Sequence, residues 1–292
     1  MVREKLKRGC AGTLLVLVAL VLAAVAVIHY QAGRTPPGRP VYVALGSSFA
    51  AGAGLGKLQP GSPWACARSV GGYPPRLARL LHTEMVDMSC GGAVTDNLLS
   101  GGQFFQGPQI RVIGPETRIV TITVGGNDVG YIGDLSMLAA RNSGSLFGRG
   151  AGLFWAGPQS GQQRDFAGLE RKLVALVAVI RERAPAARVV IATYPAIMPA
   201  QGTCPLLSLG PDEVALMRDV GDRLAATTRS AAARSGAVPV DMNALGQGHD
   251  ACAVQPWVRG WVNGGIAPFH PTALGAEATA QAIAQALAAS PD

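Results

Sequence analysis

The sequence carries little charge for its length. Of its 292 residues, 15% are Asp, Glu, Lys or Arg, whereas 49% are hydrophobic. The formal net charge is +7, but the first eight residues, MVREKLKR, supply +3 of it and leave about +4 spread over the rest of the chain. Nucleic-acid binding needs a clustered basic surface, so no nucleic-acid partner is expected. The apolar share predicts a folded domain with a full core.

A nucleotide-binding loop is also absent, although residues 43–57, VALGSSFAAGAGLGK, are rich in glycine. A P-loop needs a glycine five residues before its Gly-Lys pair and a Ser or Thr after it, where this chain has Ala51 and Leu58. The glycines from Gly52 to Gly56 are spaced G-x-G-x-G, not G-x-G-x-x-G as in a dinucleotide fingerprint. No cofactor is therefore expected. What remains is a serine at the end of a buried strand, with small residues around it that let another molecule approach.

One long apolar run stands near the start of the chain. Residues 11–28, AGTLLVLVALVLAAVAVI, contain no charge and have about the length at which a signal peptide and a membrane anchor become hard to separate. Ala24 and Ala26 form an A-x-A cleavage pattern, but it lies inside the run, which favours a retained anchor over a cleaved signal. The basic residues before the run predict a cytoplasmic N-terminus and an exported remainder. The predicted segments are a basic tail (1–10), the anchor or signal (11–28), a linker (29–40) and one domain (41–292).

Cysteine is scarce, and export makes its placement informative. Cys10 precedes the apolar run, and the other four lie in the exported part, where disulfides persist. Three pairings are possible; we favour Cys66 with Cys90 and Cys204 with Cys252, because each pair closes a local loop and could contribute roughly 3 to 4 kcal/mol. No C-x-x-C occurs, and His82 and His249 have no partners at ligand spacing, so no metal site is expected.

Short β-branched runs alternate with helical patterns along the rest of the chain. The runs are VYVAL (41–45), MVDMS (85–89), RIVTITV (118–124), RVVIATY (188–194) and AVPVDM (237–242). This alternation predicts an α/β fold, a three-layer α/β/α sandwich with a central parallel five-stranded sheet. The last helix is expected to begin after Thr272 as N-cap and to run to about Ala288. Residues 135–163 are rich in Gly and Ser without a clear period, which predicts an irregular insertion beside the site.

In such a sheet, catalytic groups collect on the loops that follow the strands. A serine hydroxyl needs a histidine base and donors for the oxyanion of the tetrahedral intermediate. Ser48 can be the nucleophile and His270 the base. The backbone N–H groups of Ser48 and Gly92 and the side-chain amide of Asn127 can form the oxyanion hole.

These residues stand in four blocks that resemble the motifs of the SGNH (GDSL-type) hydrolases. GSSFAAG resembles their G-D-S-x-x-x-G block, CGGA their glycine block, GGND their G-x-N-D block and PFHPTALG their histidine block, in the family's order along residues 41–289. CARSVGGYPPRLA, SCGGAVT and GHDAC further resemble the secreted actinobacterial esterase/lipase branch, whose cysteines pair locally. The resemblance implies the flavodoxin-like SGNH fold and a cofactor-free esterase.

Two positions depart from the family pattern. Ser47 replaces the aspartate of the first block, and Ala267 replaces the aspartate of D-x-x-H that orients the histidine. A buried backbone carbonyl can accept the Nδ1–H bond and fix the tautomer, although it stabilises the imidazolium less than a carboxylate. We therefore predict a Ser48–His270 dyad supported by the Ala267 backbone carbonyl, with Asp250 or Asp241 as the alternative orienting group.

The function predicted from these residues is an exported serine esterase or lipase that hydrolyses carboxylic esters. Its partners would be a small-molecule or lipid ester and, through the apolar run, a membrane. One alternative keeps the chemistry on acetylated envelope polysaccharide. Another is a membrane-tethered pseudoenzyme that binds without turnover, suggested by Ser47 and Ala267.

Overall fold

The computed structural model describes residues 2–34, 40–151, 155–262 and 265–289. Its centre is a sheet of five parallel strands in the order β2-β1-β3-β4-β5. The strands are β1 (Tyr42–Gly46), β2 (Met85–Asp87), β3 (Ile119–Thr123), β4 (Arg188–Ala192) and β5 (Val238–Val240). Each predicted run overlaps one of these strands, so the predicted parallel five-stranded sheet is confirmed.

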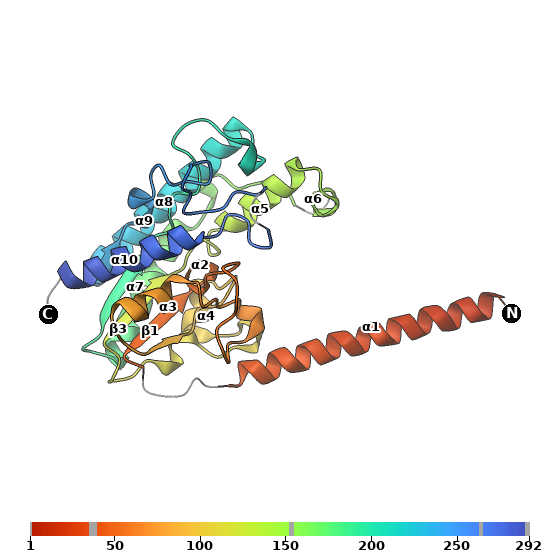
Figure 1. The fold of residues 1–292 in the computed structure, drawn as a ribbon, viewed down its shortest axis with the longest axis horizontal. Coiled ribbons are helices and arrows are strands. Elements are labelled where there is room, and N and C mark those ends of the chain that lie inside the picture. Colours follow the sequence, from red (N-terminus) through yellow and green to blue (C-terminus); the bar gives the residue numbers. More distant parts are fainter. Residues whose placement is uncertain (1, 35–39, 152–154, 263–264, 290–292) are drawn as a thin grey trace.

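Helices cover both faces of the sheet, as Figure 1 shows. Successive strand side chains point to opposite faces, so each strand feeds two cores. Val43, Val120 and Ile191 pack in the core shared with α5, α7 and α8, whereas Tyr42 and Val190 pack in the core shared with α3 and α10. The helices of the domain are α2 (Ser48–Ala51), α3 (Tyr73–Leu80), α4 (Thr95–Ser100), α5 (Tyr131–Asn142), α6 (Leu146–Ala151), α7 (Phe166–Arg183), α8 (Pro211–Ser235), α9 (Met242–Leu245) and α10 (Ala273–Ala289). Short 3-10 turns are η1 (Trp64–Cys66), η2 (Gln103–Phe105), η3 (Gln109–Val112), η4 (Gly161–Gln163) and η5 (Pro205–Leu207).

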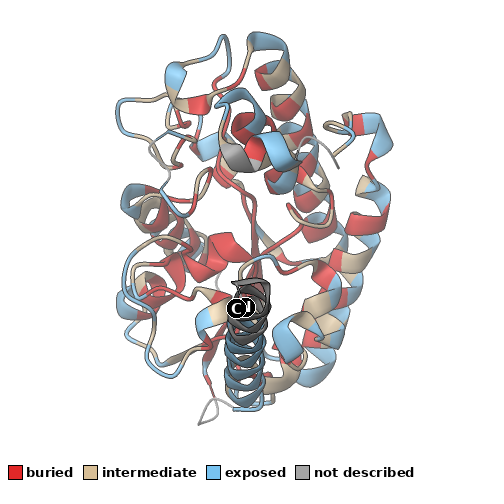
Figure 2. Cartoon of the chain, turned by 90° about the vertical axis from the view of Figure 1, so that its right-hand side faces the viewer, coloured by how far each residue is buried: buried red, intermediate tan, exposed pale blue. Residues whose placement is uncertain are grey.

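Burial follows this layering. Figure 2 shows buried residues along the central strands and on the inward faces of the surrounding helices. The start of α10 is where the sequence predicted it. The Thr272 hydroxyl accepts a hydrogen bond from the Gly275 N–H at 3.1 Å and caps the helix. The carboxyl ends of β1, β2 and β3 are neighbours in the parallel sheet, and α10 packs against α3, β4 and β5.

The expected insertion at 135–163 is only partly irregular. Its first residues belong to α5, whose Leu135 and Leu138 are fully buried, and α6 follows after a short turn. The Gly and Ser content hid this helix because its first apolar positions, Tyr131 and Ile132, lie before the segment. Residues 152–154 of the insertion lie outside the described residues.

The apolar run lies in a single long helix, α1 (Val2–Ala32). An 18-residue window within Thr13–Ala32 has a mean hydropathy of 2.6 and no buried residue, so by length and composition this helix could cross a membrane. It extends away from the α/β domain and meets it only near its C-terminal end (Figure 1). The helix includes the first residues of the expected linker, because the helical pattern continues to Ala32.

Both favoured disulfides are present. Cys66 is bonded to Cys90 and Cys204 to Cys252, with sequence separations of 24 and 48 residues. The first joins η1 to the segment after β2, and the second joins the segment before η5 to that after α9. Both therefore stabilise long connections on the domain's loop side.

Candidate active site

Ser48 is presented by a sharp turn at the end of β1. Gly46 has φ +141°, and a Cβ there would overlap the carbonyl oxygen of Thr123, so only glycine fits. The Gln109 side chain bonds both the N–H and the carbonyl of Gly46, at 2.9 and 3.0 Å. The chain then enters α2 with Ser48 as its first residue, and the amide of a first helical residue has no acceptor within the helix. Both the hydroxyl and the amide of Ser48 are thus placed at the loop edge of the sheet.

His270 reaches Ser48 from the turn that precedes α10. Its Nε2 lies 2.7 Å from the Ser48 Oγ, and its Nδ1 lies 2.8 Å from the carbonyl oxygen of Pro268. A carbonyl only accepts, so Nδ1 carries the proton and Nε2 presents its lone pair to the serine hydroxyl. The structure therefore brings together the predicted nucleophile and base, 222 residues apart in the chain.

The orienting carbonyl belongs to Pro268, so the prediction of Ala267 was wrong. Phe269 has φ +59°, which folds the chain back so that the ring of His270 meets the carbonyl two residues earlier. Phe269 is fully buried, and its packing holds this unusual backbone conformation. The family motif marks the side chain three residues before the histidine and carries no signal for this turn.

The two aspartates considered as alternatives have other partners. Asp241 caps α9 through the Ala244 N–H at 3.1 Å and pairs with Arg229 at 2.9 Å. The Asp250 carboxylate accepts from the Cys252 N–H at 2.8 Å and so fixes the turn beside the second disulfide. Within the described residues, neither aspartate bonds to His270.

Burial decides the protonation of His270. Desolvation lowers the pKa of its imidazole, and repulsion from the Arg259 guanidinium lowers it further, while the Pro268 hydrogen bond opposes both. Arg259 lies against the glycine-rich loop, where its Nη2 donates to the Gly54 carbonyl at 3.0 Å. Neutral His270, the form that can accept a proton, is therefore favoured.

The three donors predicted for the oxyanion hole lie after three neighbouring strands. Gly92 follows β2, has φ +79°, and is held by Gln103, which donates to the Gly91 carbonyl at 2.5 Å. Asn127 follows β3 and donates one amide proton to the Ala93 carbonyl at 2.9 Å, which leaves its second amide proton for a ligand. The β2-β1-β3 order puts these loops on either side of Ser48.

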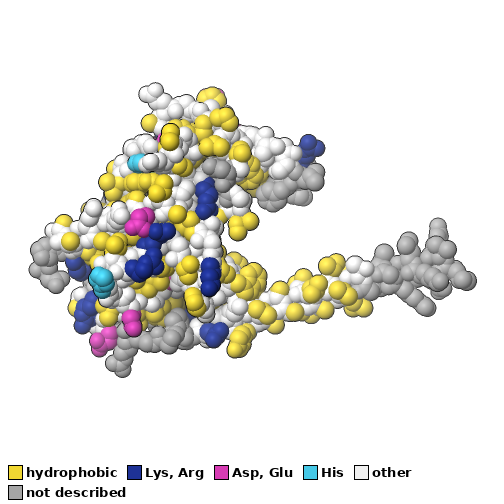
Figure 3. All heavy atoms as spheres, viewed as in Figure 1, with side chains coloured by type: hydrophobic (Ala, Val, Ile, Leu, Met, Phe, Trp, Pro, Cys, Tyr) yellow, Lys and Arg dark blue, Asp and Glu magenta, His cyan; other side chains and the backbone are white. Residues whose placement is uncertain are grey.

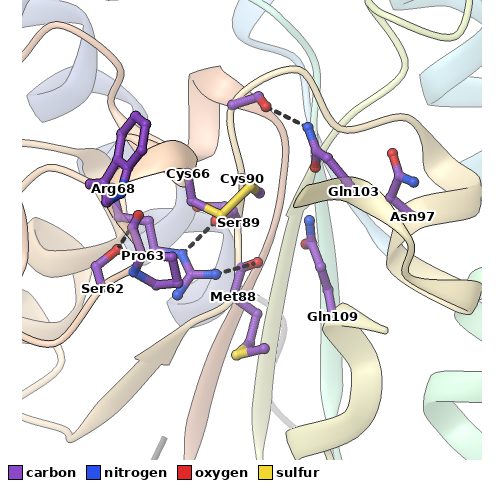
Figure 4. The surroundings of a disulfide bond; sticks show 12 residues. Ser62, Pro63, Cys66, Arg68, Met88, Ser89, Cys90, Asn97, Gln103 and Gln109 are labelled. Carbon is purple, nitrogen blue, oxygen red and sulfur yellow. Dashed lines mark hydrogen bonds between the residues drawn. A yellow bond between two sulfur atoms is a disulfide. The ribbon is translucent and has the colours of Figure 1, made fainter. Parts of the chain in front are cut away.

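A disulfide and a carboxylate hold the Gly92 loop. Cys66 and Cys90 join η1 to this loop, and the Gly91 N–H donates to the Cys66 carbonyl at 2.9 Å (Figure 4). Both oxygens of Asp128 accept from the Thr95 N–H at 3.0 Å, although burial raises the pKa of this carboxyl. The Asp128 side chain thus ties the β3 loop to the start of α4, a structural role.

Sequence reasoning missed the packing of Phe49 and Tyr194 around Ser48 and His270, and it noted Ser47 without its partner Tyr194. Ser47 is fully buried, and its hydroxyl lies 2.7 Å from that of Tyr194, where the family has an aspartate. Phe49 packs between the rings of Tyr194 and His270, with centroid distances of 4.2 and 5.3 Å. Ser47 and Phe49 adjoin Ser48 in the sequence, whereas nothing in the sequence connected Tyr194 with the site.

Across the described ranges, no group of three or more His, Cys, Asp or Glu side chains could hold a metal ion. A serine hydroxyl, a neutral histidine and several N–H donors at one edge form a set suited to acyl transfer.

The chain is similar to known hydrolases over most of its length. Residues 44–278 match the GDSL-like Lipase/Acylhydrolase family. Lipase 2 of Streptomyces coelicolor is 33% identical over 241 residues, which are 80% of this chain and 81% of that protein. A lipase of Streptomyces rimosus is 29% identical over 235 residues, with 80% and 81% covered.

Two solved structures share the fold. The crystal structure of the extracellular lipase from Streptomyces rimosus has a TM-score of 0.67 at 28% identity and covers 84% of this chain and 98% of its own. Phospholipase A1 from Streptomyces albidoflavus NA297 also has a TM-score of 0.67, at 26% identity, with 85% and 99% covered.

Proposed function

The chain belongs to the GDSL-like lipase/acylhydrolase family and is an ester-bond hydrolase, and we propose that it acts outside the cytoplasm through Ser48 and His270. The observation that carries this proposal is the contact of 2.7 Å between the Ser48 Oγ and the Nε2 of a histidine whose Nδ1 bonds a carbonyl. A binding protein has no need of this arrangement. The geometry thus favours catalysis over the non-catalytic alternative.

The proposed reaction has two acyl-transfer steps. His270 Nε2 takes the Ser48 proton as Oγ attacks the ester carbonyl, and the N–H groups of Ser48, Gly92 and Asn127 stabilise the oxyanion. His270 then gives the proton to the leaving alkoxide, and an acyl-serine remains. A water molecule, deprotonated by His270, hydrolyses this acyl-enzyme and restores Ser48.

We propose an acyl lipid as the substrate class. The similar proteins are named lipases and a phospholipase A1, which supports a fatty-acyl ester over an acetylated polysaccharide. The polysaccharide alternative stays a prediction, and a substrate panel separates the two. Hydrolysis rates are measured over p-nitrophenyl esters of rising chain length and on acetylated xylan. The rates on the p-nitrophenyl acyl esters are expected to be higher than the rate on the xylan.

A labelling experiment tests the site. A fluorophosphonate is expected to label the full-length chain at Ser48, and Ser48→Ala should abolish both labelling and ester hydrolysis. Ser47→Ala is the matched control, because its hydroxyl bonds Tyr194 and not His270. Labelling of a different serine would contradict the assignment.

We further propose that α1 holds the domain on the outer face of the plasma membrane. Support comes from its apolar segment Thr13–Ala32, from the basic residues that precede it, and from two disulfides in the domain. N-terminal sequencing of the protein from the membrane fraction tests this. An N-terminus after Ala26 would show a cleaved signal instead.

A further inference from the structure

A second cavity lies apart from Ser48 and His270. It has a volume of about 290 Å³, and neither of these two residues lines it. Edge strand β2, residues 59–63 before η1, and Arg34, which follows α1, contribute to its walls. Its polar lining consists chiefly of Arg34, Arg68, Arg111, Asp87, Gln59 and Gln106. The volume is at the small end of ligand sites and suits a small anion or a headgroup.

The cavity has an excess of positive charge. Three arginines and one aspartate line it, so its formal charge is +2. The Asp87 carboxylate is already used, because its Oδ1 accepts from the N–H and hydroxyl of Ser89 at 2.9 and 2.6 Å and its Oδ2 accepts from Gln59 at 2.7 Å. Within the described residues, none of the three arginines forms an ion pair with a carboxylate.

Arg68 is buried and Arg111 is partly buried, and neither forms a direct ion pair with a carboxylate among the described residues. Arg68 is 5% exposed, and its Nε and Nη2 donate to the carbonyls of Ser89 and Met88 at 2.5 and 3.1 Å (Figure 4). Arg111 donates to two backbone carbonyls of its own loop. Burial lowers the pKa of both guanidinium groups; for Arg68, attraction to Asp87 opposes this effect and a smaller repulsion from Arg111 adds to it. An anion between them would relieve this repulsion.

Gln106 adds an unused donor to the same lining. It is 7% exposed, and its Nε2 has no hydrogen-bond partner among the described residues. Buried donors in proteins are almost always paired, so this one points to a missing acceptor. Gln106, Arg68 and Arg111 also line the small void adjoining the cavity, so the three donors lie in one region.

We propose that this cavity is a binding site for a phosphate group. Guanidinium groups form paired, charge-assisted bonds with phosphate oxygens, and the Gln106 amide can donate to another. The Arg68 bonds to Met88 and Ser89 connect the site to the segment that continues into Gly92. An occupant would therefore also stabilise the loop that carries the proposed oxyanion donor.

The position of the cavity favours a phospholipid headgroup as the source. Arg34 follows α1 by two residues, and Gln31 of that helix accepts a hydrogen bond from the Trp64 N–H at 3.0 Å. Figure 3 shows the apolar side chains of α1 continuing to its junction with the domain, where basic side chains begin. A headgroup of the membrane that α1 would span lies at this level. This source rests on the proposed membrane anchor, whereas the phosphate chemistry does not.

Thermal unfolding of the full-length chain in a phosphate-free nonionic detergent tests the site. Inorganic phosphate and glycerol phosphate are expected to raise Tm by roughly 2–4 °C at saturation, against sodium chloride at equal ionic strength. Ser48→Ala is the background for this measurement, because it should abolish ester hydrolysis and leave the cavity intact. Failure of the catalytic proposal and failure of this one are thus separable.

Two matched substitutions are expected to change Tm in opposite directions. Gln106→Glu puts a carboxylate beside the arginines, so it should raise Tm without phosphate and weaken phosphate binding at least tenfold. Gln59→Glu puts the same change against Asp87, at a present distance of 2.7 Å, and should lower Tm. Loss of stability or failure to fold in Gln106→Glu would overturn the proposal, as would an unchanged Tm with both phosphate compounds.

Lipid nanodiscs distinguish the two sources. Full-length protein is reconstituted into phospholipid nanodiscs, ejected into the mass spectrometer and compared with Gln106→Glu. One phospholipid retained by the parent and lost in the variant supports a headgroup. Stabilisation by inorganic phosphate with no retained lipid supports a free phosphate, which keeps the site and rejects the lipid source.

Discussion

Replacing Asp250 or Asp241 with asparagine is expected to leave ester hydrolysis nearly unchanged, although each is the kind of residue that orients a catalytic histidine. In this structure the Pro268 carbonyl accepts a hydrogen bond from the Nδ1–H of His270 at 2.8 Å. Asp250 bonds the Cys252 amide, and Asp241 caps α9 and pairs with Arg229. The orienting group is thus a main-chain atom that no side-chain substitution removes.

The two outcomes differ by a wide margin. Loss of the carboxylate from a Ser-His-Asp triad costs about 10⁴-fold in the serine-protease example, or about 5.5 kcal/mol. Here we expect kcat/KM to fall less than about tenfold, which is under about 1.4 kcal/mol of transition-state stabilisation. Folding should also tolerate both changes, because asparagine keeps an acceptor oxygen for each amide and the partly exposed pair with Arg229 contributes about 1 kcal/mol or less.

The assay is kcat/KM on a soluble p-nitrophenyl ester, with circular dichroism as the check on folding. His270→Asn is the positive control, and it should remove nearly all activity because asparagine cannot act as the base. A drop of a thousandfold or more in Asp250→Asn, with an unchanged dichroism spectrum, would refute orientation by Pro268. That aspartate would then be the third member of a triad.

Two further predictions follow from contacts around the pair. Ser47→Ala leaves the buried Tyr194 hydroxyl without its partner at 2.7 Å and should cost about 1–3 kcal/mol of unfolding free energy. Adding Tyr194→Phe should cost less than the sum of the two single changes in urea unfolding, whereas strict additivity would show that the hydroxyls do not interact. The pH profile of kcat/KM should keep its acid limb below the ordinary histidine pKa of about 6.5, because burial lowers the pKa of His270 and only the neutral imidazole can accept the proton. Arg259→Gln removes a nearby positive charge and should move that limb to higher pH; a shift to lower pH would contradict the proposed repulsion.

The fold could be predicted because its signals are local and repeated. Five β-branched runs fixed the strands within a few residues, and the spacing of apolar residues in α7 and α8 marked the faces that are now buried. The prediction of an irregular insertion at 135–163 was partly wrong because it relied on the Gly and Ser content of the segment and not on the spacing of its apolar residues. The α5 helix was not predicted because the segment taken as an insertion begins at residue 135, after two of the buried positions of this helix.

The contact between Ser48 and His270 could also be predicted, but the group that orients His270 could not. Ser48 and His270 stand in motifs that specify residue type, and the sheet topology brings their loops together. The Pro268 carbonyl depends on the positive φ of Phe269, which its burial among distant side chains maintains. Such a conformation arises from packing and leaves no trace in the two or three residues around it.

The space beside residue 267 is too small for the aspartate that the family has at this position. A Cβ on Gly54 would lie 2.7 Å from the Ala267 Cβ and 2.6 Å from the Arg259 Nη1, so little room separates the three residues. An aspartate at position 267 would meet the glycine loop and the guanidinium of Arg259 before it could reach His270. Arg259 in turn contributes to keeping His270 neutral, a role that a paired carboxylate would cancel. The small side chain of Ala267 thus fits the close loop at Gly54, while the carbonyl of Pro268 orients His270. Restoring the family aspartate at position 267 alone would therefore not rebuild a triad.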